Sequence, residues 1–107
     1  MATIQKVLTI GSTPVLALTG NGTRRRGWRV TYISSAKIAG NTGRVHLGRN
    51  YAPNTTLGDP NSGDAITQSE ERTEAKRFND DHVFGGDIWL VATIATQQLE
   101  VEETLED

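Results

Sequence analysis

The chain has 107 residues, no cysteine and a net charge of −2, with 36% hydrophobic residues and eleven glycines. This is the size and composition of one loop-rich domain with a single thin core. No apolar run reaches the roughly 20 residues that a membrane-spanning helix needs, the first residues lack the basic and apolar regions of a secretory signal, and the lack of cysteine excludes disulfides and thiolate zinc sites.

The positive and negative charges are divided between the two halves of the chain. Residues 1–50 contain eight Lys and Arg and no acid, whereas residues 51–107 contain all thirteen Asp and Glu and only three bases. Two arrangements satisfy this division. Either the halves interleave in one sheet and opposite charges pair across strands, or the surface is dipolar and docks on a copy of itself or on an assembly of complementary charge.

The first half of the chain predicts four strands separated by turns rich in Gly, Asn and Pro. The strands are expected at residues 4–10, 15–18, 28–33 and 44–47. The third strand belongs to the stretch 24–35, which begins as a basic turn and continues with β-branched and aromatic residues. One face of it carries Trp28, Val30 and Tyr32, and the other carries Arg29, Thr31 and Ile33.

The second half begins with a long irregular segment at residues 48–63, where no periodicity is visible. A loop of this length in a small domain is often an interaction element, and Tyr51 and Leu57 are expected to anchor it to the body. The segments that follow are a short strand at 65–68, an extended edge or one helical turn at 69–76, and a second loop at 78–86.

The most strand-like segment of the second half lies at residues 87–95, with apolar residues on both faces. Such a strand is covered on both sides, by a second sheet or by another subunit. Residues 98–103 alternate between apolar and acidic, with Leu99 and Val101 pointing inward, and are expected to form a hairpin with the preceding strand. Residues 104–107 form a short acidic end that is mobile unless it docks.

Six to eight short strands with turn signals every 8 to 12 residues predict an all-β fold. We expect a small antiparallel β-sandwich or jelly-roll-like barrel with long irregular loops. Residues 1–107 then form a single β domain with a short mobile N-terminus and an acidic C-terminal end.

The candidate reactive groups do not predict an enzyme. His46 alternates with apolar neighbours and is expected to point away from the core, while His82 follows two aspartates in a loop for which a solvated surface is the favoured interpretation. Residues 59–70 approach a calcium loop, but Asp64 stands where that loop needs glycine. We therefore expect no catalytic residue, no metal site and no cofactor.

The basic turn at residues 24–29 is the strongest candidate for a contact surface. Arginines beside a tryptophan suit single-stranded nucleic acid, but the net negative charge of the chain favours protein contacts, so no nucleic acid partner is expected. The candidate protein–protein contact residues are Arg24, Arg25, Arg26, Trp28, Arg29, Tyr51 and Trp89. If this turn makes the contact, Arg25→Glu should weaken docking in a salt-dependent way.

The order of these elements resembles that of small virion proteins of tailed bacteriophages. The resemblance is carried by the segments RRGWRVTYIS at 25–34, RVHLG at 44–48, IWLVA at 88–92 and LEVEE at 99–103. It spans most of residues 4–103, while the loop at 49–63 and the charged segment at 69–77 have no counterpart in that pattern.

This resemblance implies a decoration or cement protein on the capsid exterior, which stabilises the capsid by binding between capsomers. Its implied partners are the major capsid protein and copies of itself, with a homotrimer favoured, and no membrane. The competing function is a glycan- or receptor-binding module on a virion fibre or spike. In that case Tyr51, Trp89 or Trp28 would serve as the sugar platform.

Overall fold

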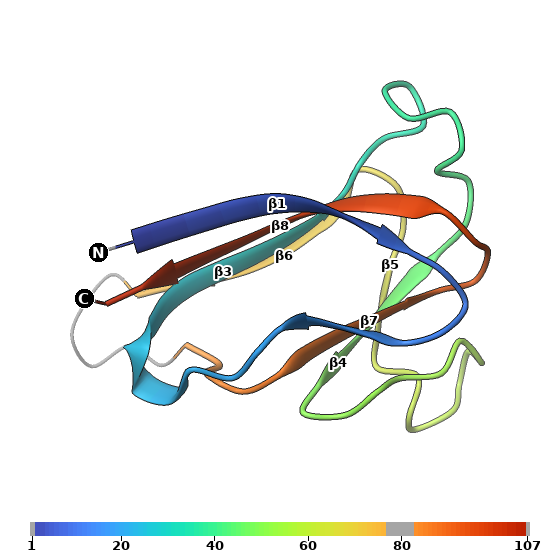
Figure 1. The fold of residues 1–107 in the computed structure, drawn as a ribbon. Helices are drawn as coiled ribbons and strands as arrows, with labels where there is room; N and C mark the ends of the chain where they lie inside the picture. The colour runs from blue at the N-terminus through green and yellow to red at the C-terminus, as the bar shows by residue number, and fades with distance from the viewer. Residues whose placement is uncertain (1, 77–82, 107) are drawn as a thin grey trace.

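The chain folds as a sandwich of two antiparallel four-stranded sheets (Figure 1). The computed structural model describes residues 2–76 and 83–106. Sheet A contains, in spatial order, β1 (Ala2–Ile10), β8 (Gln97–Leu105), β3 (Arg25–Tyr32) and β6 (Glu71–Ala75). Sheet B contains β2 (Val15–Leu18), β7 (Ile88–Ala92), β4 (Val45–Arg49) and β5 (Asp64–Ile66). The prediction of a small all-β antiparallel sandwich is confirmed.

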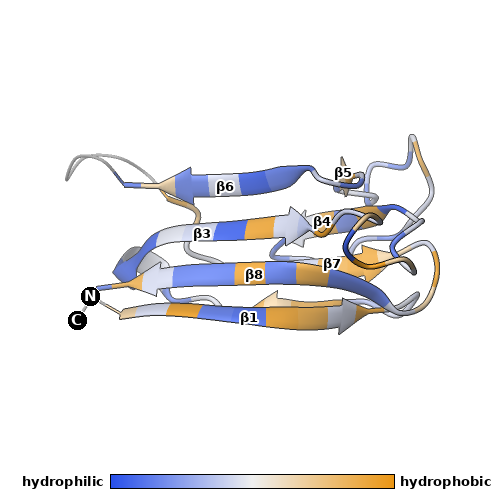
Figure 2. Cartoon of the chain, turned by 90° about the horizontal axis from the view of Figure 1, so that it is seen from above, coloured by the Kyte–Doolittle hydropathy of each residue, from blue (hydrophilic) through white to orange (hydrophobic). Residues whose placement is uncertain are grey.

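The hydrophobic core lies between the two sheets and follows the two-residue period of the strands. The buried residues of β3, β8 and β7 include Trp28, Val30, Tyr32, Leu99, Val101, Ile88, Leu90 and Ala92. Figure 2 shows apolar and polar bands alternating along β3 and β8. Because successive side chains of a strand point to opposite faces, the sequence pattern separated the two faces of β3 and predicted the inward face of β8 correctly.

The predicted hairpin between the last two strands is wrong. β7 pairs with β2 and β4, whereas β8 pairs with β1 and β3 in the other sheet. Residues 93–96 therefore carry the chain from sheet B to sheet A. The side-chain amide of the buried Gln97 holds this corner, because it donates to the carbonyls of Gly40 and Ala95 at 2.8 and 3.0 Å. Since both edges of β7 are occupied by strands of its own sheet, β8 cannot pair there.

The outer cover of β7 comes from the same chain. The loop at residues 50–63 runs below sheet B in Figure 1 and contains the buried Pro53. It lies so close to β4 that a Cβ at Gly48 would collide with the carbonyl oxygen of Tyr51 and lie 2.9 Å from Pro53 Cδ. Val91, on the outer face of β7, is buried as well. On the outer face of β7, Val91 is thus buried within this chain, while Trp89 stays half-buried.

Both described ends of the chain are held in sheet A (Figure 1). Ala2 pairs with Leu105 across β1 and β8, and the backbone N–H of Glu106 donates to the carbonyl of Arg24 at 2.7 Å. The sequence predicted a short mobile N-terminus, but the chain is paired in a strand from Ala2 onward. The acidic C-terminal end is docked through residue 106. A short 3₁₀ helix, η1 (Gly22–Arg24), leads into β3.

Two remaining expectations concern residues 69–86. The sequence allowed either an extended edge or one helical turn at residues 69–76. This segment contains the edge strand β6. The predicted loop at 78–86 lies only partly within the described residues, and His82 lies outside them. In residues 2–76 and 83–106, no helix is long and apolar enough to cross a membrane.

Candidate functional site

The basic half and the acidic half of the chain meet in sheet A. Arg29 on β3 lies 2.8 Å from Glu102 and 3.6 Å from Glu100 on the neighbouring β8. Arg26 pairs with Glu106 at 2.7 Å. Pairing across strands, one of the two arrangements that the charge division allowed, is therefore observed. These pairs neutralise charge at short range, which weakens the case for a dipolar docking surface.

Arg25 is fully buried and ties four segments together. Its Nε donates to Glu103 at 2.7 Å, and its Nη2 donates to the carbonyl of Thr19 at 2.9 Å. Its Nη1 donates to the carbonyls of Phe84 and Gly86 at 2.9 and 2.8 Å. A guanidinium removed from water needs such partners, and here they are present. Arg25 is therefore structural, and the expectation that Arg25→Glu reports on docking is corrected, because that change would place two carboxylates together inside the fold.

Trp28 is also buried, in a stack at one end of the core. Its indole N–H donates to Glu74 at 3.0 Å, and the guanidinium carbon of Arg49 lies 5.3 Å from its ring centroid. The same guanidinium lies 5.8 Å from the ring of Phe84 and pairs with Glu74 at 3.4 Å. Cation–π and charge contacts thus hold the stack together. Because Trp28 is only 2% exposed, it offers no surface for docking or for a sugar.

The remaining candidate contact residues differ in what they expose. Arg24 is exposed, while Arg26 and Arg29 are partly exposed and already paired. Tyr51 is exposed in the long loop, and Trp89 is half-buried on β7, opposite Leu16 of β2. The structure therefore does not bring the seven candidates into one patch.

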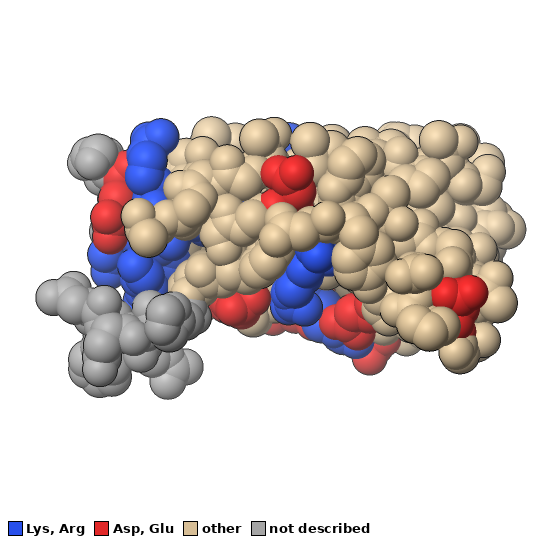
Figure 3. All heavy atoms as spheres, turned by 90° about the horizontal axis from the view of Figure 1, so that it is seen from below, with Lys and Arg blue, Asp and Glu red and all other residues tan. Residues whose placement is uncertain are grey.

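The exposed large apolar side chains gather mainly on one side of the molecule. In the described residues they are Ile4, Val7, Val15, Leu16, Tyr51, Leu57 and Ile94. Four of them, Leu16, Tyr51, Leu57 and Ile94, belong to β2, to the loop at 50–63 and to the turn after β7, all parts of sheet B or its connections. Val15 pairs with the inward-facing Leu90, so it points to the other face of β2. Figure 3 shows the sheet B side, where uncharged residues form most of the surface. We call these four residues the sheet B face, and such apolar gatherings mark contact sites.

Most of the sheet B face could not be predicted from the sequence. Leu16 and Ile94 fall in strand-like apolar runs, which are read as core in the absence of a fold. Leu16 is exposed because β2 is an edge strand of four residues, and Ile94 because the chain leaves the sheet before it. Tyr51 was recognisable from the sequence, since an aromatic residue in a long polar loop stands out.

The two sides of the sandwich where the sheets are not joined by hydrogen bonds differ: an ion pair closes one, and the other stays open. On the β5–β6 side, Arg72 donates to the two carboxylate oxygens of Asp64 at 2.6 and 3.2 Å. On the β1–β2 side a cavity of about 200 Å³ remains, lined by Ile4, Lys6 and Leu16 among others. An ion pair closes the first side, whereas the second side stays open and is lined by both apolar and polar residues.

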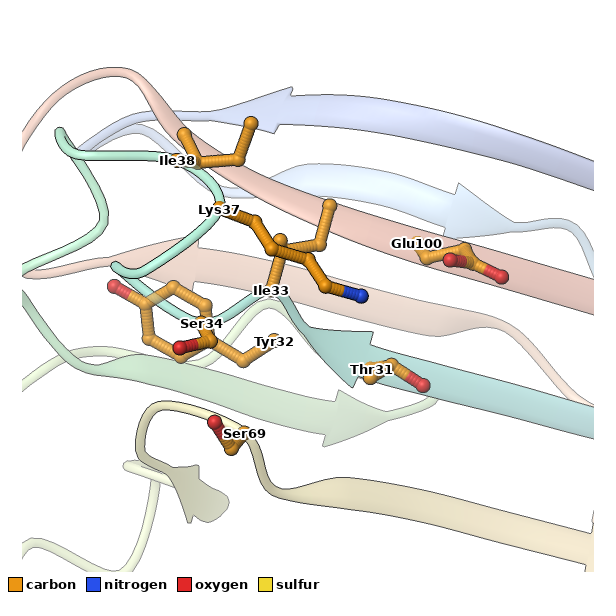
Figure 4. A pocket seen from close by; sticks show the side chains of 8 residues that line it. All are labelled: Thr31, Tyr32, Ile33, Ser34, Lys37, Ile38, Ser69 and Glu100. Atoms are coloured by element: carbon orange, nitrogen blue, oxygen red, sulfur yellow. The ribbon is translucent and has the colours of Figure 1, made fainter.

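A hollow of about 510 Å³ lies beside the end of β3 (Figure 4). Lys37 extends across it toward Glu100, and Ile33 and Ile38 supply apolar walls. Tyr32 also lines it, but its hydroxyl donates to the carbonyl of Gly43 at 3.0 Å. Burial raises the pKa of Tyr32 more than this bond lowers it, so the phenol stays neutral. No buried side-chain polar atom of the described residues lacks a hydrogen-bond partner.

The groups considered for metal binding are engaged in other bonds. His46 points away from the core, as predicted, but lies buried beneath the long loop: its Nδ1 donates to the carbonyl of Ser62 at 2.8 Å, and its Nε2 accepts from Arg44 at 2.7 Å. Asp59 accepts from the backbone of Asn61 at 2.8 Å. Residues 2–76 and 83–106 contain no cluster of three or more His, Asp or Glu that could hold a metal ion.

The turn before β6 leads to a pH-dependent prediction. Glu70 accepts from the hydroxyl of Thr67 at 2.6 Å and from its backbone N–H at 2.7 Å. These bonds, the hydroxyl bond most of all, hold the pKa of Glu70 below its usual range, with a smaller effect of Arg72. We expect an NMR titration to show this low pKa and Thr67→Val to raise it toward the usual value.

The sign of the effect on stability follows from the lowered pKa. The folded state favours ionised Glu70, so the stabilisation is present above the unfolded pKa and is lost as the pH falls through the folded pKa. Thr73→Val, on β6 beyond this turn, is the control and should leave the Glu70 titration unchanged. An unaltered Glu70 pKa in Thr67→Val would contradict the prediction.

The chain was also compared with known proteins. No model of a protein family, no curated protein and no solved structure matches it. The basis for a function is therefore the set of residues and surfaces described above.

Proposed function

We propose that this protein is a structural virion protein that decorates a phage capsid and stabilises it by binding between capsomers. Its partners are then the major capsid protein and further copies of itself on the capsid exterior. The resemblance noted in the sequence implies three copies. The observation that carries the proposal is the sheet B face, on which Leu16, Tyr51, Leu57 and Ile94 are exposed.

The physical properties of the two faces support an adhesive role. The outer face of sheet A carries ion pairs such as Arg29–Glu102, whereas the sheet B side is mostly uncharged (Figure 3). Uncharged surfaces with exposed aromatic and aliphatic side chains lose little on desolvation and suit contact with another protein. The loop at 50–63 enlarges this face, and its packing on Gly48 holds it in one position.

The test is binding to capsids that lack this protein. Leu16→Asp combined with Ile94→Asp should weaken binding at least tenfold, because two charges would be buried in the contact. Ala36→Asp is the matched control, since Ala36 is exposed in a turn that follows β3 of the opposite sheet, and it should bind like the unchanged protein. Unchanged affinity of the double variant, or no binding of the unchanged protein to such capsids, would refute the proposal.

A glycan-binding module is the second candidate, favoured by one observation. A shallow hollow of about 470 Å³ is lined by Tyr51, Arg49 and Asp64 together with Leu47, Pro60 and Gly63. An exposed aromatic ring beside charged hydrogen-bonding groups suits a sugar. Tyr51→Ala should then abolish a signal on a glycan array while leaving the melting temperature nearly unchanged. An array without signal at high protein concentration would remove this candidate.

A further inference from the structure

β1 differs from the other edge strands in having little protection against pairing. β5 has three residues and β2 has four, whereas β6 carries the charged residues Glu71, Arg72 and Glu74. β1 has nine residues, no proline and one charge, Lys6. Its register with β8 runs without a shift from Ala2 to Ile10, so no bulge twists it away. Long, regular and weakly charged edges are templates for another strand.

The side chains of β1 are exposed on both faces. Val7, on the outer face, is 59% exposed, and Ile4, on the same face as the buried Ile10, is 53% exposed. Ile4 lines the open cavity on the β1–β2 side, which would close if another strand continued sheet A. The edge therefore offers both unpaired backbone groups and apolar side chains.

We propose that the occupant of this edge is β1 of a second copy, paired antiparallel about a two-fold axis at Val7. Directly opposite residues of an antiparallel pair point to the same face of the sheet. The two copies therefore share an inner face only if the two-fold axis passes through one residue of β1. An axis at Lys6 would place two ammonium groups directly opposite each other, and an axis at Gln5 would place Ile4 opposite Lys6. An axis at Val7 pairs Val7 with Val7, Ile4 with Ile10 and Lys6 with Leu8.

The area available is sufficient for a specific but weak dimer. A nine-residue strand is roughly 30 Å long. The edge of the sandwich is about as thick as the 10 Å spacing of two sheets plus their outer side chains, so length and thickness together give an edge surface of roughly 500 Å² per copy. The total of about 1,000 Å² lies at the lower limit for a specific interface. We therefore expect a concentration-dependent equilibrium between monomer and dimer.

The two-fold contact has a consequence for the number of copies. A contact between identical surfaces closes with two copies, so it replaces the trimer that the sequence resemblance implied. The contact centres on β1 of sheet A, whereas the proposed capsid contact centres on the sheet B face; Leu16 borders both, since it also lines the cavity beside Ile4. A change at Val7 leaves the sheet B face unaltered, so the dimer and the capsid function can be tested separately.

Because the chain has no cysteine, single engineered cysteines report the register directly. At the axis, residue 7 of one copy lies opposite residue 7 of the other, at a separation of about 4.5–5.5 Å that a disulfide can bridge. Val7→Cys should form a disulfide-linked dimer at least ten times faster than Gln5→Cys under mild oxidation. In this register residue 5 pairs with residue 9, so two Gln5→Cys thiols lie about 13 Å apart along the strand.

The unchanged protein and a charged variant complete the test. Native mass measurements should show a dimer that grows with concentration, and Val7→Lys should remove it without loss of fold, since Val7 is mostly exposed. A trimer, a monomer at every concentration, or equal cross-linking of Val7→Cys and Gln5→Cys would overturn the inference. A monomer that still binds capsids would overturn it and leave the proposed function standing.

Discussion

Arg25→Met is expected to lower the free energy of unfolding by about 3–5 kcal/mol, the cost of removing one partner of a buried ion pair. Glu103, itself only 7% exposed, would keep one side-chain partner, Asn21 at 3.0 Å. The carbonyls of Thr19, Phe84 and Gly86 would also lose their donor. Urea denaturation measures the loss as a lower midpoint at an unchanged slope.

Arg29→Met is the matched control for Arg25→Met. Arg29 makes an ion pair of similar length, 2.8 Å to Glu102, but its side chain is 37% exposed. Solvent screens such a pair, so the loss should stay below about 1 kcal/mol. The double variant Arg25→Met with Glu103→Leu should recover part of the stability, because it removes the stranded carboxylate. Equal small losses in Arg25→Met and Arg29→Met would contradict the structural role of Arg25.

Gly48→Ala is expected to lower the free energy of unfolding by about 1–3 kcal/mol, the usual cost of overpacking. The added methyl group would occupy the space of the Tyr51 carbonyl oxygen, and Pro53 is 2.9 Å away. The loop at 50–63 would have to lift from sheet B. Thermal unfolding measures the stability loss, and hydrogen exchange of the loop amides should rise with it.

Gly40→Ala is the control for Gly48→Ala. A Cβ at Gly40 has no atom within 4 Å, and its backbone is not in the left-handed region. Alanine restricts the unfolded chain more than glycine does, so this variant should be neutral or more stable by up to about 1 kcal/mol. A Gly48→Ala variant as stable as Gly40→Ala would show that the loop does not pack on β4 as described.

Much of sheet A was predictable from sequence because its strands repeat with a period of two. The alternation of Trp28, Val30 and Tyr32 grouped the residues that form the buried face of β3, and Leu99 and Val101 were predicted to point inward from β8. The charge division between the halves allowed pairing across strands as one of two arrangements, and the structure shows such pairing between β3 and β8. These features are local or compositional, so they need no knowledge of which strands are neighbours.

The candidate site was less predictable, and Arg25 shows why. From the inward Trp28, a strict two-residue period places Arg26 inside and Arg25 outside. The register shift between Arg25 and Gly27 inverts this alternation, so Arg25 is buried and Arg26 lies at the surface. A bulge depends on the partner strand, and three consecutive arginines do not reveal it.

The sequence by itself determined that the chain is all-β, where most strands lie and which of their faces are apolar. Only the tertiary structure decided that β7 and β8 belong to different sheets, that the loop at 50–63 packs on β4, and that Ile4, Val7 and Leu16 remain exposed. The reason is that alternation is set by neighbouring residues, whereas sheet membership and exposure depend on contacts between segments far apart in the chain.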